Sequence, residues 1–433
     1  MGNISKISHF CELGADFDLT ILPLFDARPA TRKPATQNPV PPTVTNNISR
    51  LGLNIYSPQK KIPSYENLLC REMARRQNEY DTHQTISSFW FSGSPLKQLT
   101  PEAITELCFR FSNHFSHGTA HKAMRGISTT TSELNKQTLA LLAGLHFNCI
   151  ELTVDASIAG NDRSLDKLKA VVALTEDYGQ IKLMFRVRTG DHTHPDFLAR
   201  LLAHITDIPC QQVEIVCAGV MRDAAQAGLG ALRSTQRLLQ QTLRFFRALN
   251  WANCGNNFFF PPDHPLSVLR RQKKLFFTPW GYQNRIDQTM LGLGVNGLSL
   301  INGEYQRNCA NPETYRQCVS ENTPLPITRY TLDNQFDDLY ASLQALLCFH
   351  DISTPFQDNN PLEQLIDKGW VDTSSVNRER SLSLSEDGLI HLTQVCELLY
   401  PPRKYPPQKN DSYNVSTRKK DGYNVSTKPE LQG

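Results

Sequence analysis

The chain has 433 residues, of which 39% are hydrophobic and 20% are charged, the composition of a globular protein that can bury at least one large core. Its formal net charge of +3 is too small for nucleic acid or an anionic membrane to be the main partner. No apolar run approaches the roughly 18–20 residues of a membrane-spanning helix. The N-terminus lacks the basic start and apolar core of a secretory signal, so the sequence predicts a cytoplasmic protein.

The first elements alternate between strand and helix. Residues 1–50 read as an N-terminal arm that ends in a linker rich in Pro, Thr and Asn over 28–50, a composition that cannot form a core. Short apolar strands are predicted at 51–56 and 85–91, with a helix between them. A second helix begins with Thr100 as N-cap and Pro101 at its first position.

The same unit then repeats. Helical spacing and short apolar runs predict strands at 148–155, 181–188, 211–219 and 256–260, each preceded by a helix. In 181–188, Ile181, Leu183, Phe185 and Val187 alternate with polar residues. Strands separated by amphipathic helices form parallel sheets. About six units predict an α/β fold, a partial or complete parallel β/α barrel, whose ligands lie at the carboxyl ends of the strands.

The C-terminal part departs from this pattern. Helix, extended segment and helix, with Ser385 as the cap of the last helix, predict a small helical, winged-helix-like domain within 306–402. The last helix carries no Lys or Arg before Arg403, so we expect it to pack against protein and not DNA. Residues 403–433 contain the direct repeat DSYNVSTRKK–DGYNVSTKPE and are expected to be a disordered tail, either a recognition tag for a partner or without a role.

The sequence contains few residues in a pattern that could bind a metal. The 11 cysteines are scattered, and none form a C-x-x-C or C-x-x-x-C pair, so we interpret them as reduced core thiols. In GDHTHP, residues 190–195, Asp191, His192 and His194 follow a strand and could ligate a metal or haem, or form a solvated loop.

Two glycine-containing segments are further candidates. WFSGSP, residues 90–95, ends the second strand with small residues that let a backbone approach a ligand, although G-S-P is also a common turn. WGYQNRIDQTMLGLGVNGLSLING, residues 280–303, contains G-x-G, a weak nucleotide signal that close packing explains equally well. Together with one residue at the end of the third predicted strand, the candidates for ligand contact are Gly93, Ser94, Pro95, Asp155, Asp191, His192, His194, Trp280, Tyr282, Asp287, Gly292 and Gly294.

In order, these segments resemble the oxygen-independent coproporphyrinogen III oxidase family of radical S-adenosylmethionine (SAM) proteins. The similarity runs from Leu51 to Leu399. WFSGSP is similar to the family's W-G-G-G-T-P turn, and WGYQNRID…LGLGVNGLS is similar to its Q-G-Y-x-x-x-x-D…L-G-x-G-x-S-A-I-S segment. The resemblance implies a radical-SAM-like barrel over 51–305 and a coproporphyrinogen-oxidase-like domain over 306–402.

The resemblance also identifies what this chain lacks. Family members carry H-I-P-F-C-x-x-x-C-x-x-C after the first strand, where three thiolates hold a 4Fe–4S cluster that binds SAM. Here NIYSPQKKIPSYENLL has no cysteine, and amide or ammonium groups are poor iron ligands. The family's SAM-contacting glutamate falls at Ser128, its glutamine at Asp155 and its ribose-binding aspartate near Phe185. Phe91 replaces a glycine and is expected to close the turn to a ligand.

We therefore expect no 4Fe–4S cluster and no SAM. The sequence predicts a non-catalytic, coproporphyrinogen-oxidase-like protein, a pseudoenzyme that binds a protein partner or a tetrapyrrole-like ligand in porphyrin or haem metabolism. Two alternatives remain open. One is a haem-binding or haem-handling protein, with His192, His194, Trp280 and Tyr282 at the ligand. The other is an enzyme with different chemistry in the same barrel.

Overall fold

The computed structural model describes residues 26–31, 50–77, 85–114, 123–190, 193–217, 229–255, 257–284, 288–301, 304–331, 337–352, 360–376 and 379–399. Contacts divide the chain into a unit of residues 1–402 and a unit of residues 403–433. The predicted tail and its repeat thus lie outside the described residues. The domain boundaries predicted at residues 50 and 305 stay predictions.

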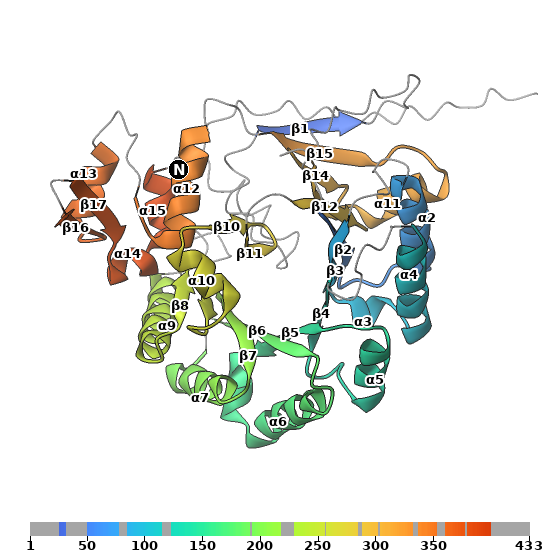
Figure 1. Ribbon diagram of the computed structural model, residues 1–433, viewed down its shortest axis with the longest axis horizontal. Coiled ribbons are helices and arrows are strands. Elements are labelled where there is room, and N and C mark those ends of the chain that lie inside the picture. Colours follow the sequence, from blue (N-terminus) through green and yellow to red (C-terminus); the bar gives the residue numbers. More distant parts are fainter. Residues whose placement is uncertain are drawn as a thin grey trace, which may run out of the picture. The chain divides into compact units, whose positions relative to one another are not determined.

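A 13-stranded sheet forms the centre of the described part. Its middle strands all run parallel and curve into an arc (Figure 1). In spatial order they are β12 (Gln288–Leu293), β2 (Arg50–Ser57), β3 (Thr85–Gly93), β4 (Met124–Thr130), β5 (Cys149–Asp155), β6 (Lys182–Thr189) and β7 (Cys210–Cys217). The predicted α/β class is confirmed, and the barrel is partial.

Antiparallel strands extend both ends of this arc, so the described sheet stays open. Beyond β12 lie β13 (Leu298–Ile301), β14 (Glu304–Asn308), β15 (Pro326–Thr331) and β1 (Asp26–Thr31). Beyond β7 lie β9 (Phe258–Phe260) and β8 (Ala252–Cys254).

Three strand predictions need correction. The strand predicted at 256–260 was expected to add a parallel β/α unit, but β9 pairs antiparallel with β7. The segment interpreted as an arm contains a strand, β1, that pairs with β15. The strand β4 was not predicted, because its sequence MRGISTT has little apolar content.

Helices cover the outer side of the arc (Figure 1). The longer ones are α2 (Tyr65–Gln77), α4 (Pro101–His114), α5 (Lys136–Gly144), α6 (Asp162–Glu176), α7 (Pro195–Thr206) and α9 (Leu229–Ala248). Shorter ones are α3 (Pro95–Gln98), the 3₁₀ helix η3 (Ala156–Gly160), α10 (Pro265–Arg271) and α11 (Pro312–Ser320). The predicted cap of α4 is present, since Thr100 Oγ1 accepts a hydrogen bond from Ala103 N at 3.2 Å.

The core lies between the outer face of the sheet and these helices. Every second residue of β6 contributes to it, and Leu183, Phe185 and Val187 are all buried. On β3, the Phe89 ring stacks on Phe111 of α4 with centroids 4.2 Å apart. Since successive strand residues point to opposite faces, the residues between these apolar ones face the inside of the arc.

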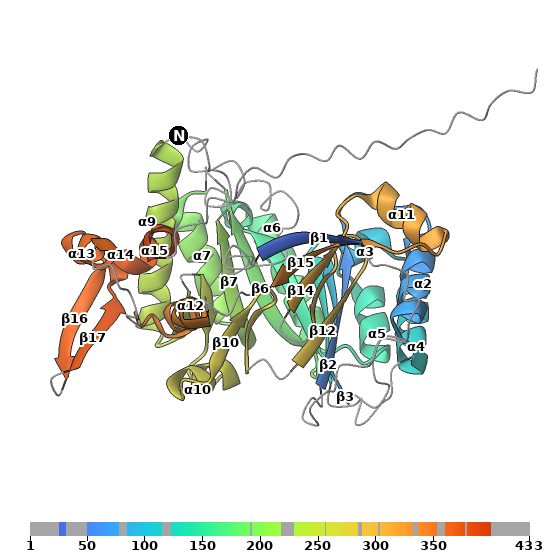
Figure 2. The same cartoon turned by 90° about the horizontal axis from the view of Figure 1, so that it is seen from above.

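The C-terminal elements are helices joined by a hairpin, in agreement with the predicted small helical domain. They are α12 (Asp337–Phe349), α13 (Asn360–Asp367), β16 (Val371–Val376), β17 (Glu379–Leu384), α14 (Glu386–Ile390) and α15 (Leu392–Leu399). Figure 2 shows β16 and β17 projecting beside the helices. Ser385 caps α14, as expected, but the predicted last helix is divided in two at His391. Within the described ranges, no helix is long and apolar enough to cross a bilayer.

Candidate functional site

The inner face of the parallel strands is polar. A parallel sheet covered on both faces is normally apolar on both, and buried polar groups are costly unless they are hydrogen-bonded. A polar inner face therefore indicates a site and not a second core. Its buried or half-buried polar and aromatic side chains include Asn54, Trp90, Ser92, Ser128, Glu151, Arg186, Gln212 and Glu214.

Side chains of β2, β3 and β4 form one half of this face. Ser92 Oγ donates a hydrogen bond to Asn54 Oδ1 at 2.7 Å. Trp90 Nε1 donates to Ser128 Oγ at 3.1 Å. The Trp90 ring lies over Gly126, where an added Cβ would come within 2.0 Å of it. Glycine at this position thus makes room for the indole.

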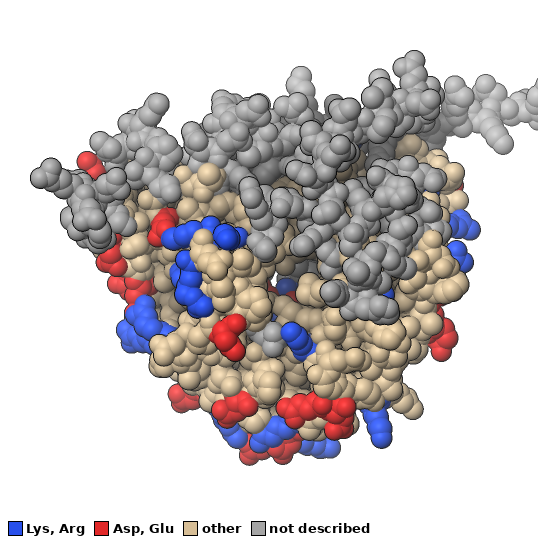
Figure 3. Space-filling view, viewed as in Figure 1, with Lys and Arg blue, Asp and Glu red and all other residues tan. Residues whose placement is uncertain are grey.

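Charged side chains of β5, β6 and β7 form the other half. Arg186 lies between two carboxylates, with Nε 2.7 Å from Glu214 Oε2 and Nη1 3.2 Å from Glu151 Oε1. All three side chains are no more than 14% exposed. Both carboxylates thus contact the same guanidinium. In Figure 3, the hollow near the centre of the view contains charged side chains of both signs.

The environment of Glu151 differs from that of Glu214. The Arg186 Nε–H donates to Glu214, whereas the buried Oε1 of Glu151 accepts no hydrogen bond from any described residue. Cys149, two residues earlier on β5, is buried, and burial and the Glu151 charge raise the pKa of its thiol to about 12. The inner face therefore offers a carboxylate acceptor but no thiolate at this point.

The predicted WFSGSP turn closes against the end of β2. Gly93 has φ +81°, and a Cβ there would lie 2.1 Å from the carbonyl oxygen of Ser57. Ser94 N donates to that same oxygen at 2.8 Å, and Pro95 begins α3. Gly93 is thus required by the close approach of β2. The expectation that Phe91 closes this turn is wrong, because its ring faces the outer side, packed against Phe89 and Phe147.

The loop between β2 and α2 is held by one side chain. The Gln98 carbonyl accepts a hydrogen bond from Ile62 N at 3.0 Å, and its amide donates to the carbonyl oxygens of Pro58 and Lys60, both at 2.6 Å. Gln98 is 5% exposed. The loop after β2, where the resemblance predicts the cluster loop to be missing, is held against α3 by these hydrogen bonds.

A buried carboxylate, which the sequence did not reveal, lies next to the predicted Gly294. Glu72 of α2 accepts hydrogen bonds from Gly294 N at 2.8 Å, Asn308 Nδ2 at 2.8 Å and Tyr315 Oη at 2.7 Å. Burial raises the pKa of Glu72, while Arg76 and these donors lower it. Gly294 has φ +96°, and a Cβ there would lie 2.2 Å from Tyr65 Oη. This glycine serves the packing of α2 on the sheet.

Gly292 and the predicted aromatic residues also have packing partners. A Cβ on Gly292 would lie 2.2 Å from the carbonyl oxygen of Leu298. Trp280 and Tyr282 belong to the hairpin of β10 (Leu275–Thr278) and β11 (Gly281–Asn284). The Tyr282 hydroxyl donates to Leu347 O at 3.1 Å, and Trp280 lies beside Tyr305 with ring centroids 6.1 Å apart.

The remaining candidates lie at or near the strand ends. Asp155 Oδ1 accepts from Ser157 N at 2.9 Å and caps η3. His194 Nδ1 accepts from Asp196 N at 3.3 Å and caps α7. Asp191, His192 and Asp287 lie outside the described residues. No cluster of three or more His, Cys, Asp or Glu suited to a metal occurs in the part of the chain that the structure describes.

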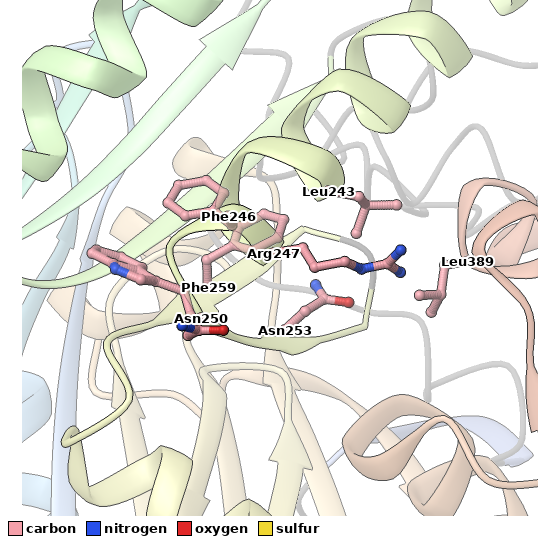
Figure 4. Close-up of a pocket in the computed structure, with 8 residues that line it drawn as sticks. Leu243, Phe246, Arg247, Asn250, Asn253, Phe259 and Leu389 are labelled. Atoms are coloured by element: carbon pink, nitrogen blue, oxygen red, sulfur yellow. The ribbon is translucent and has the colours of Figure 1, made fainter.

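A separate pocket of about 290 Å³ lies away from the inner face, between α9, the β8–β9 edge and α14 (Figure 4). Phe246 and Phe259 stack at 4.1 Å in its wall. Arg247 at its rim is bound to Glu386 of α14 at 2.6 Å. None of the predicted site residues line it, and its ion pair joins the C-terminal helices to α9.

The chain is similar in sequence to several known proteins, each at low identity. No family model matches the chain. It is 21% identical over 350 residues to oxygen-independent coproporphyrinogen III oxidase from Salmonella typhimurium, covering 78% of this chain and 75% of that protein. It is 23% identical over 309 residues to the Pseudomonas aeruginosa protein of the same name, covering 66% and 67%.

A solved structure shares the fold. Coproporphyrinogen III oxidase from Escherichia coli, described as a radical SAM enzyme, superimposes with a TM-score of 0.65 and 18% identity over 81% of this chain and 90% of that one. The chain resembles the oxygen-independent coproporphyrinogen III oxidase family. Among the positions at which the resemblance predicted lost SAM contacts, Ser128 lies on the inner face and accepts a hydrogen bond from Trp90, whereas Phe185 is buried on the outer face.

Sequence reasoning missed the most polar part of the inner face. Glu151, Arg186 and Glu214 belong to strands that were predicted, and each lies between two buried apolar neighbours. The alternation of apolar and polar residues along these strands was the available signal, because polar side chains between buried apolar ones lie on the face of the sheet opposite the helices.

Proposed function

We propose that the protein is a non-catalytic relative of coproporphyrinogen III oxidases that binds a tetrapyrrole-class ligand against the polar inner face of its partial barrel. The observation that carries this proposal is the contrast between two places in one sheet. The loop where the family pattern has its cluster cysteines is bound to Gln98. The inner face keeps buried charged residues that no core requires.

Several features of the loop side argue against a cluster and SAM. Residues 51–69 contain no cysteine, and iron in such clusters is held by thiolates. The carbonyl oxygen of Ser57 already approaches Gly93 and accepts from Ser94 N, so protein atoms contact the turn that receives SAM in the family. The donor set here does not fit the 4Fe–4S cluster, and we derive no step through it.

The ligand class follows from the relatives and from the inner face. The matched proteins are named for their action on coproporphyrinogen. In this chain the inner face combines an indole ring, hydroxyl groups and the Glu151–Arg186–Glu214 group. A flat aromatic surface beside a few polar groups suits a large ring with polar substituents.

Iron and sulfide analysis of the purified protein, after anaerobic reconstitution with iron and sulfide, tests the loss of the cluster. We expect no iron that stays bound after desalting and no absorbance from a cluster. About four irons per chain, the content of one 4Fe–4S cluster, would contradict the proposal. An intact family member treated in parallel serves as the positive control for reconstitution.

Titration with metal-free coproporphyrin and with haem tests the ligand class. We expect saturable binding, measured by quenching of tryptophan fluorescence, and a change in the Soret band. A Trp90→Phe variant, which removes the hydrogen bond to Ser128, is expected to bind more weakly than a Trp370→Phe variant, whose ring stacks on His391. His194→Asn, which can still cap α7, tests the haem alternative: a Soret change that is lost in this variant would support ligation of haem iron by His194. Absence of binding to either compound would refute the tetrapyrrole proposal.

A further inference from the structure

Glu151 is the group on the inner face whose hydrogen bonding the protein leaves incomplete. The residue is 8% exposed, and its Oε1 accepts no hydrogen bond among the described residues. Leaving a buried carboxylate oxygen without a donor costs free energy. Arg186 Nη1 forms an ion pair with this oxygen at 3.2 Å, but the contact is not a hydrogen bond. Glu151 thus has a neighbouring charge but lacks a hydrogen-bond donor.

The surroundings of Glu151 determine which donor would suit it. Because Glu151 Oε1 is a buried carboxylate oxygen that accepts no hydrogen bond among the described residues, an N–H donor that is charged or strongly polarised would be stabilised beside it. Across β4, the Trp90 ring lies against Gly126, and Glu151 is the register partner of Ser128, which accepts a hydrogen bond from that indole. An aromatic face next to a carboxylate attracts ammonium groups and N–H groups on flat rings.

We propose that Glu151 Oε1 accepts a hydrogen bond from an N–H donor of the bound ligand and thereby selects ligands that present one. Two sources supply this chemistry: the pyrrole N–H groups of a reduced, metal-free tetrapyrrole, and the ammonium group of an alkylamine. Only the first source rests on the function proposed above. Glu151 is a specificity-determining residue for either source.

The experiment compares both sources on the full-length protein and its variants. Coproporphyrinogen III, kept reduced under argon, is the probe for pyrrole N–H donors and is followed by equilibrium dialysis. Spermidine at low ionic strength is the ammonium probe and is followed by calorimetry. Glu151→Gln replaces the carboxylate with an amide of the same shape. Thr153→Val, on the same strand and face, is the matched control.

We expect Glu151→Gln to weaken binding of the preferred probe by about 10-fold to 100-fold, the loss of one charge-assisted hydrogen bond. Thr153→Val should stay within about 3-fold of the wild type. Glu151→Asp keeps the charge on a shorter side chain and should bind the probe better than Glu151→Gln. This order would show that Glu151→Gln weakens binding through the lost charge and not through misfolding.

The outcomes separate this inference from the proposed function. Equal binding of a probe by wild type and Glu151→Gln, or no binding of either probe by wild type, would overturn the role of Glu151. Binding of spermidine alone, with dependence on Glu151, would support it and refute the tetrapyrrole function. Binding of coproporphyrinogen III that depends on Glu151 supports both.

Discussion

Two buried carboxylates on opposite halves of the same sheet have different surroundings. Glu72, beside β12, accepts hydrogen bonds from a backbone amide, an asparagine and a tyrosine. Glu151, on β5, has an oxygen that accepts none from any described residue. A carboxylate with a complete set of donors stabilises the fold, while one without such a set remains able to bind another molecule. In the β2–β12 half, the outer side where α2 and Glu72 lie thus behaves as core, and in the β5–β7 half, the inner face where Glu151 lies belongs to the site that also includes Trp90.

Among the variants considered, Gly93→Ala is expected to lower the free energy of unfolding most. It places a Cβ at φ +81° and 2.1 Å from a backbone oxygen of β2, so both strain and overlap should destabilise the fold by about 3–5 kcal/mol. Urea denaturation followed by circular dichroism measures the change. Gly144→Ala, at the end of α5 with no atom near its Cβ position, should be neutral or stabilising by up to about 1 kcal/mol. Equal effects of the two would show that the β2–β3 contact is dispensable.

Glu72→Gln should destabilise the protein by about 2–3 kcal/mol. The amide turns an N–H group toward the donors whose hydrogen bonds Glu72 now accepts, so at least one buried donor loses its acceptor. The urea midpoint is the measurement. Asp166→Asn, at a side chain that is 71% exposed, should change stability by less than about 0.5 kcal/mol. A Glu72→Gln protein as stable as the wild type would remove the distinction between the two halves of the sheet.

His350 is another buried group with hydrogen bonds at both ring nitrogens, and its contribution to stability should depend on pH. His350 Nε2 donates to Gly255 O at 2.9 Å and Nδ1 accepts from Arg270, and burial and that arginine lower its pKa to about 3. Because the unfolded histidine binds a proton below about pH 6.5 and the native one does not, stability should fall as pH decreases from about 6.5 to about 3.

Between pH 7 and pH 5 the free energy of unfolding of the wild type should fall by about 2 kcal/mol more than that of His350→Gln. The glutamine keeps a donor and an acceptor but does not titrate. Urea midpoints of the two proteins across this range give the difference. If the two stability curves ran parallel, His350 would not be held neutral by its surroundings.

Gln98→Ala should have a smaller and more local effect. It removes three hydrogen bonds to the loop after β2, at an expected cost of about 1–2 kcal/mol, since water can reach part of this loop. Faster amide hydrogen exchange at Ile62 with unchanged exchange in β5 would confirm that the loop is held from α3. Exchange that stays slow at Ile62 would mean that other contacts hold the loop.

Glu151→Gln should have the smallest effect on stability, about 1 kcal/mol or less, because it removes an ion pair with Arg186 but leaves that guanidinium bound to Glu214. The same substitution at Glu72 provides the matched comparison. A large destabilisation by Glu151→Gln would place this carboxylate with the core, and the two halves of the sheet would no longer differ.

The sequence predicted five of the seven parallel strands and the longer helices between them, because these elements bury a face with a regular period. It did not predict β12, whose sequence QTMLGL was interpreted as part of a glycine-containing segment. It failed at β4, whose serine and threonines give no apolar signal, and at β9, where a run of phenylalanines does not encode strand direction. Candidate residues chosen for turns and loops proved to be caps or close contacts, as at Asp155 and Gly93. Contacts across the sheet, such as Arg186 with two glutamates, join residues far apart in sequence and could not be read from it.

The pairing of β1 with β15 has a practical consequence for anyone who shortens this protein. Register partners run from Asp26–Thr331 to Thr31–Pro326, so a version that starts near residue 50 would leave the backbone amides and carbonyls of β15 open along one side. Open strand edges recruit other chains. Such a shortened protein is expected to self-associate, and retaining the segment from residue 26 onward should keep it monodisperse in light scattering.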